Sequence, residues 1–89
     1  MKSLKLKIKN KLGIHARPAS MIVDAAMKHS GNIKLIANGI VADAKSILSI
    51  MMLAAECGTE IEITAENNSD DDKAADDIKN LFERKFDED

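Results

Sequence analysis

The chain opens with apolar and charged side chains in alternation. Residues 4–9 read Leu-Lys-Leu-Lys-Ile-Lys, and the alternation covers residues 2–9. A period of two residues is typical of a β-strand with one buried and one solvated face, so we predict a strand over this range. The pattern breaks at residues 10–14, which we expect to form a loop.

A helical period follows this loop. Beyond Ala16, apolar residues recur at the spacing i, i+3, i+4, i+7, namely at Ala19, Ile22, Val23 and Ala26. This spacing places one apolar stripe along an α-helix. Basic residues suit the negative end of a helix dipole and glycine commonly follows a helix. We therefore expect Lys28 and His29 to close the helix before Gly31, with His29 as a C-cap rather than a catalytic residue.

Strand and helix signals alternate after residue 32. Two β-type runs, 33–37 and 40–44, flank Asn38-Gly39, the dipeptide that most favours a two-residue hairpin turn. Ser46 precedes an apolar run over residues 47–55, which predicts a short helix.

The remaining residues predict one more strand and one more helix. Residues 59–65 alternate apolar and polar side chains, which is the strand pattern. Ser69 and the three aspartates after it resemble a capping box at the start of a helix. The buried face of that helix is predicted at Ala74, Ala75, Ile78, Leu81 and Phe82.

The predicted order is therefore β-α-β-β-α-β-α. Four strands that each alternate apolar and polar residues predict an antiparallel sheet, solvated on one face and covered by helices on the other. This is an α+β two-layer sandwich. At 89 residues the chain is too short for two cores, so we expect one domain over residues 1–89. Folds of this kind serve many functions, so function must be argued from a site.

Composition narrows the function classes. Aromatic residues make up 2% of the chain, which leaves almost nothing to stack on bases, so nucleic acid is not an expected partner. A single cysteine, Cys57, excludes an intramolecular disulfide and fits a reducing compartment. No apolar run is long enough to span a membrane and no signal-peptide core is present. We expect a cytoplasmic protein without membrane insertion, metal or cofactor.

Residues 13–19, Gly-Ile-His-Ala-Arg-Pro-Ala, carry the candidate chemistry. They place His15 at a loop-to-helix junction, where unpaired backbone N–H groups and the helix dipole favour an anion. Arg17 can grip phosphate oxygens through its planar fork of donors, and Pro18 stiffens the first turn at little cost. A neutral imidazole is a good nucleophile, which suits phosphoryl acceptance. The alternative is that His15 only caps the helix and Arg17 is a surface charge.

Four segments resemble one protein family. Residues 13–19, Asn38-Gly39, residues 42–48 (Ala-Asp-Ala-Lys-Ser-Ile-Leu) and Gly58-Thr59 are similar, at matching spacing, to HPr, the histidine-containing phosphocarrier of the bacterial phosphotransferase system. The resemblance implies an open-faced sandwich with strand order 1-4-2-3 and three helices on one face. It also implies that the chain is a carrier with a transient phosphohistidine rather than an independent enzyme.

The same resemblance implies the site roles. His15 is expected to be phosphorylated on Nδ1 by phosphorylated enzyme I, which draws on phosphoenolpyruvate, and to pass the group to enzyme IIA proteins in sugar uptake. Arg17 is expected to assist. Acidic residues 87–89 extend slightly beyond the family's last helix and are expected not to touch the phosphoryl site. The chain is expected to act as a monomer.

Ser46 is a second candidate site. As the residue before a helix it is predicted to be an N-cap, and a phosphate there would still meet free amide groups. In relatives the matching serine is the target of HPr kinase/phosphorylase, and the resemblance adds a transcriptional regulator as a further partner. Ile47, Leu48 and Met51 match docking positions, and an apolar run on a short helix must leave some side chains exposed.

Two other functions stay open at this point. The first is an HPr-like regulatory protein that is phosphorylated but not coupled to sugar transport. The second is a ligand-sensing or structural α+β module in which His15 has no chemical role. Phosphate transfer from enzyme I to His15 separates this last reading from the others.

Overall fold

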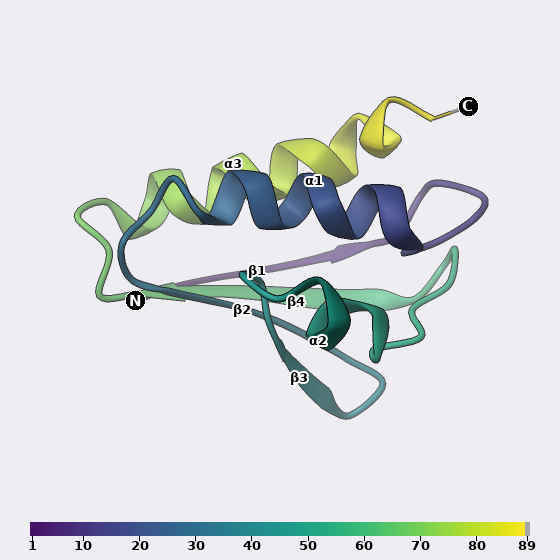
Figure 1. Ribbon diagram of the computed structural model, residues 1–89, viewed down its shortest axis with the longest axis horizontal. Coiled ribbons are helices and arrows are strands. Elements are labelled where there is room, and N and C mark those ends of the chain that lie inside the picture. The colour runs from purple at the N-terminus through teal and green to yellow at the C-terminus, as the bar shows by residue number, and fades with distance from the viewer. Residues whose placement is uncertain (89) are drawn as a thin grey trace.

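Four antiparallel strands form one sheet in the order β1-β4-β2-β3. The computed structural model describes residues 1–88. Its elements are β1 (Lys2–Lys7), α1 (Ala16–Ala26), β2 (Asn32–Ala37), β3 (Ile40–Asp43), α2 (Ile47–Met51), β4 (Glu60–Glu66), α3 (Asp71–Glu83) and a short 3₁₀ turn, η1 (Lys85–Asp87). Helices α1 and α3 lie side by side over one face of the sheet (Figure 1), and α2 packs against α1 and β3. The open-faced α+β sandwich predicted from the sequence is confirmed.

Strand alternation places the core between the sheet and the helices. Ile63 of the central strand β4 pairs with Leu4 of β1 on one side and with Leu35 of β2 on the other. Ile22 of α1 and Ile78 of α3 are fully buried in the same core cluster. Burying an aliphatic side chain of this size stabilises the fold by about 1.5–3 kcal/mol, so the apolar face of each element determines which side faces inward.

The turn between β2 and β3 has the predicted hairpin geometry. Asn38 and Gly39 have φ angles of 53° and 74°, and Ala37 pairs with Ile40 across the turn. Two consecutive residues with positive φ define the type I′ turn, which glycine and asparagine tolerate best.

Several element ends differ from the sequence predictions. Helix α1 ends at Ala26 with Met27 as its C-cap, so His29 is not the cap. Helix α2 ends at Met51, short of residue 55.

The N-cap of α3 is Asp70, whose side chain accepts a hydrogen bond from the Lys73 N–H at 3.0 Å; Ser69 lies outside the helix. Aspartate caps a helix as well as serine does, so the acidic run did not distinguish the two positions.

Turn η1 follows α3 and is absent from the sequence predictions. Lys85, Phe86 and Asp87 have φ angles of 54°, 54° and 59°, a left-handed conformation that costs about 1–2 kcal/mol for each residue with a side chain. The fully buried ring of Phe86 offsets part of this cost by packing in the core. This turn directs Glu88 toward the start of α1.

Candidate functional site

His15 is the N-cap residue of α1, but its imidazole does not cap the helix. The backbone is extended, with φ −115° and ψ −167°, and the His15 carbonyl accepts the Ala19 N–H at 3.0 Å. The side chain makes no capping hydrogen bond and is 37% exposed. The backbone alone therefore starts the helix, and the imidazole is left for other contacts.

The loop before His15 is held rigidly against residues 55 and 56. Gly13 has a φ of 67°, and a Cβ atom there would lie 2.6 Å from the Ala55 carbonyl oxygen. The next N–H, of Ile14, donates to that same oxygen at 2.9 Å. Only glycine fits such a close approach at positive φ, so the position of His15 depends on Gly13.

The carboxylate of Glu88 contacts this site through both oxygens. Oε1 accepts a hydrogen bond from Asn10 Nδ2 at 3.0 Å, and Oε2 lies 2.8 Å from His15 Nε2. Arg17 Nη1 lies 4.0 Å from the same Oε2. The Glu88 side chain is only 9% exposed, so these partners offset the desolvation of its charge.

The expectation that the acidic residues 87–89 stay clear of the candidate phosphoryl site at His15 is therefore wrong for Glu88. The left-handed turn η1, formed without any glycine, brings Glu88 back to α1, and no local pattern signals it. Asp89 lies outside the described residues. Asn10 was also missed, although asparagine at a loop start commonly bonds nearby backbone, as Asn10 Nδ2 does with the Gly13 carbonyl at 2.7 Å.

Arg17 lies on the exposed side of the first helical turn, with 60% of its side chain exposed. Helix geometry gives the N–H groups of Ala16 and Arg17 no carbonyl partner, and Pro18 has no N–H. The start of α1 thus combines a half-exposed imidazole, a guanidinium and free amide groups. This arrangement can receive a dianionic group and hold it on a nucleophilic nitrogen.

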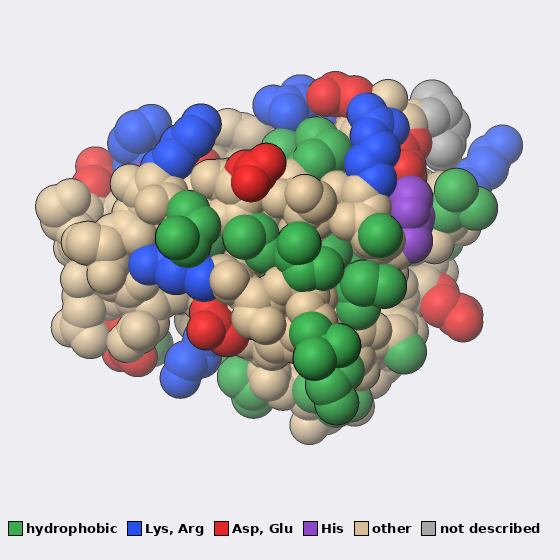
Figure 2. All heavy atoms as spheres, viewed as in Figure 1, with side chains coloured by type: hydrophobic (Ala, Val, Ile, Leu, Met, Phe, Trp, Pro, Cys, Tyr) green, Lys and Arg blue, Asp and Glu red, His purple; other side chains and the backbone are tan. Residues whose placement is uncertain are grey.

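Ser46 has the local geometry that its sequence position predicts. Its Oγ accepts a hydrogen bond from the Ser49 N–H at 3.2 Å and so caps α2. The side chains of Ile47, Leu48 and Met51 are 42%, 72% and 42% exposed, and Figure 2 shows apolar side chains gathered at the surface over this helix. Because α2 packs against α1, this apolar surface and His15 lie on neighbouring elements.

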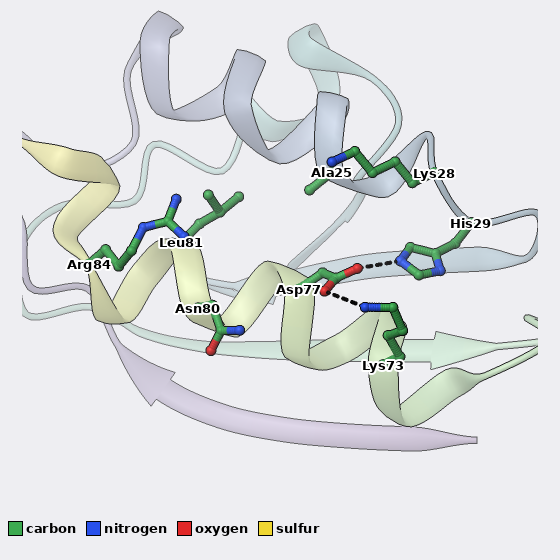
Figure 3. Close-up of a pocket in the computed structure, with 8 residues that line it drawn as sticks. All are labelled: Ala25, Lys28, His29, Lys73, Asp77, Asn80, Leu81 and Arg84. Carbon is green, nitrogen blue, oxygen red and sulfur yellow. Dashed lines mark hydrogen bonds and ion pairs between the residues drawn. The ribbon is translucent and has the colours of Figure 1, made fainter.

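A surface pocket between α1 and α3 lies apart from these residues (Figure 3). It is lined by Ala25, Lys28, His29, Lys73, Asp77, Asn80, Leu81 and Arg84. His29 Nε2 lies 2.7 Å from Asp77 Oδ2, so this histidine, where a C-cap was predicted, links the segment after α1 to α3. Burial acts to raise the pKa of Asp77, but the hydrogen bond with His29 and the charge of Lys73 outweigh it and lower the pKa.

Within residues 1–88, no helix has the length and apolar character needed to cross a membrane. Within the same range, no group of three or more His, Cys, Asp or Glu side chains could hold a metal ion.

An open-faced sandwich with a half-exposed histidine at the start of a helix is an arrangement suited to a small phosphocarrier domain, and comparison with known proteins identifies the family. A family model described as the PTS HPr component phosphorylation site matches residues 2–84. The phosphocarrier protein HPr of Treponema pallidum is 41% identical over 83 residues, covering 93% of each chain. That of Mycoplasma capricolum is 47% identical over 72 residues, covering 81% of this chain and 80% of its own.

A solved structure agrees. HPr-C-His from Thermoanaerobacter tengcongensis superposes with a TM-score of 0.93 at 38% identity, covering 100% of this chain and 99% of its own. The chain therefore belongs to the HPr family, and its role is that of a phosphocarrier of the phosphotransferase system.

Proposed function

We propose that His15 accepts a phosphoryl group from phosphorylated enzyme I and passes it to enzyme IIA proteins during phosphoenolpyruvate-dependent sugar uptake. The observation that carries the proposal is the half-exposed imidazole at the start of α1, which makes no capping bond and approaches the same Glu88 oxygen as Arg17. Family membership supplies the donor and acceptor, because HPr proteins exchange phosphate with such partners.

Arg17 and the start of α1 support the chemistry. A phosphoryl group on His15 places negative oxygens near the positive end of the α1 dipole and near a guanidinium that has room to move. These charges stabilise the transferring group without forming a covalent bond to it. The chain thereby stores the group between partners and needs no nucleotide of its own.

Ser46 and α2 form the regulatory and docking part of the proposal. Exposed Ile47, Leu48 and Met51 provide an adaptable apolar surface for enzyme I and enzyme IIA. Ser46, at the edge of that surface, is the proposed target of HPr kinase/phosphorylase, and its phosphorylated form would address a transcriptional regulator. All of these partners act in the cytoplasm, where we place a monomeric protein.

The test is incubation of the purified chain with phosphoenolpyruvate and enzyme I. An acid-labile phosphate is expected on His15, and it should move to an added enzyme IIA. His15→Ala should carry none, with a thermal midpoint within a few degrees of the parent, because a half-exposed side chain contributes little packing. His29→Gln is the matched control and should still be phosphorylated. Phosphate on His15→Ala contradicts the proposal.

A further inference from the structure

The hydrogen bond between His15 and Glu88 determines which imidazole nitrogen carries the proton. A carboxylate can only accept hydrogen bonds, so at 2.8 Å from Glu88 Oε2 the His15 Nε2 must be the donor. In a neutral imidazole the proton then resides on Nε2, and the lone pair is left on Nδ1.

We propose that Glu88 is a positioning residue for phosphoryl transfer: its carboxylate holds the Nε2 proton of His15 and so presents Nδ1 as the nucleophile. The inference rests on the proposed function, in that His15 is the acceptor. It adds to that function a residue that selects the reacting nitrogen and orients the ring.

The residues around Glu88 hold its carboxylate in one position. Asn10 is 1% exposed, and its Nδ2 donates hydrogen bonds to Glu88 Oε1 at 3.0 Å and to the Gly13 carbonyl oxygen at 2.7 Å. The same buried amide therefore ties Glu88 to the loop that carries His15. From the other side, Phe86 is fully buried and anchors η1 two residues before Glu88. Both supports hold the carboxylate in one place, as a positioning role requires.

The transfer step balances with these groups. The Nδ1 lone pair forms a bond to phosphorus as the nitrogen–phosphorus bond of the donor's phosphohistidine breaks, and that electron pair returns to the donor nitrogen. The proton stays on Nε2 throughout. The His15 ring gains positive charge in this step, and the Glu88 carboxylate beside Nε2–H stabilises it. When His15 passes the group on, the same events run in reverse.

Glu88→Gln makes a sharp test because an amide has only one oxygen. Asn10 Nδ2 is a donor, so the single oxygen of the introduced glutamine must face Asn10. The NH₂ group of the glutamine then faces His15 Nε2. A donor at that position makes Nε2 an acceptor and moves the ring proton to Nδ1. The variant should therefore place the proton on the nitrogen that has to react, while keeping nearly the same shape.

The experiment combines a spectroscopic and a kinetic measurement on the full chain. Ring ¹⁵N chemical shifts of His15, recorded without enzyme I, report the tautomer. They should show Nε2–H in the parent and a shift toward Nδ1–H in Glu88→Gln. Phosphorylation of His15 by phosphoenolpyruvate and enzyme I should be slower by about tenfold or more in the variant. Asp87→Asn is the control. It removes one charge from the neighbouring residue, which pairs with Arg84, and it should match the parent in both measurements.

The outcomes separate the two proposals. If the parent gains no phosphate on His15, the proposed function fails, whatever the tautomer. If the parent is phosphorylated but Glu88→Gln keeps the parent tautomer, or accepts phosphate as fast or faster, the role of Glu88 is overturned. A shifted tautomer with slow transfer in a variant that melts like the parent supports it, because loss of stability alone would not move the ring proton.

Discussion

The ring of Phe86 packs edge-on against the ring of Phe82, with centroids 4.8 Å apart and planes inclined at 70°. Both rings are buried, and this contact joins the turn η1 to the last helix. Edge-to-face packing of this kind stabilises beyond the burial of area alone. Two phenylalanines thus hold the part of the chain that reaches back to His15.

Phe86→Ala is expected to destabilise the protein by about 3–5 kcal/mol, since it removes a fully buried ring and leaves a cavity. Urea unfolding followed by circular dichroism measures the change. Leu12→Ala is the control, because the Leu12 side chain is 72% exposed and its loss should cost about 0.5 kcal/mol or less. Equal stability of Phe86→Ala and the parent would show that η1 is not anchored in the core.

The fold was predictable because its elements follow local patterns. Period-two runs gave the four strands, and Asn38-Gly39 gave the hairpin turn. The ends of the elements were harder to predict. At the start of α3, Ser69 and Asp70 can both cap a helix, and the choice between them depends on neighbouring contacts. His29 was misassigned for a related reason: its partner Asp77 is 48 residues away in sequence, so no local window contains both.

The site was predictable in part. His15, Arg17 and Ser46 stand in contiguous segments, and their positions at helix starts follow from residue types alone. Glu88 and Asn10 meet across 78 residues, through a left-handed turn that residue type does not favour. Tertiary packing, which sequence patterns do not record, determines that part of the site.

Acid should weaken the contact between His29, which follows α1, and Asp77 of α3. Its pKa is lowered in the folded state, so the unfolded chain binds the proton more tightly, and stability rises with pH in this range. The stabilisation is present above the ordinary aspartate pKa of about 4 and is lost as pH falls through the lower folded-state value. The difference in unfolding free energy between parent and Asp77→Asn should therefore shrink below about pH 4.

Thermal or urea melts of both proteins over an acid pH series measure that difference. Asp76→Asn is the matched control, because Asp76 is the exposed neighbour on the same helix. Its melts should follow the parent's pH dependence. A parent-to-Asp77→Asn difference that stays constant as the pH falls would show that His29 and Lys73 do not lower the pKa of this carboxyl.

Arg17→Ala should slow phosphoryl transfer by about 10²-fold while changing the unfolding free energy by about 0.5 kcal/mol or less. The rate falls because a charge that stabilises the transferring group is lost, and stability holds because the side chain is 60% exposed. Arg17→Lys keeps the charge but not the planar fork of donors, so its transfer rate should lie between those of the parent and of Arg17→Ala. Initial rates of phosphorylation by enzyme I measure the effect. Arg84→Ala, at the C-cap of α3, is the control and should transfer normally.

Ser46→Asp should slow the transfer from enzyme I to His15 through docking rather than through unfolding. A phosphoserine adds a charge of about −1.5 to −2 at pH 7, and aspartate imitates part of it. At the start of α2 the negative charge meets free amide groups, so the helix should persist. The same charge lies beside Ile47, Leu48 and Met51, where burial against a partner costs desolvation.

The rate of His15 phosphorylation, followed against the concentration of this protein, separates these effects. A docking defect lowers the rate at low concentration and is relieved at high concentration, whereas the thermal midpoint of Ser46→Asp stays near that of the parent. Ser46→Asn is the matched control, because asparagine also caps a helix but adds no charge, and it should transfer normally. If Ser46→Asp accepts phosphate as fast as the parent at low concentration, the docking role of α2 is wrong. If it unfolds while Ser46→Asn does not, the charge acts on the fold and not on the encounter with enzyme I.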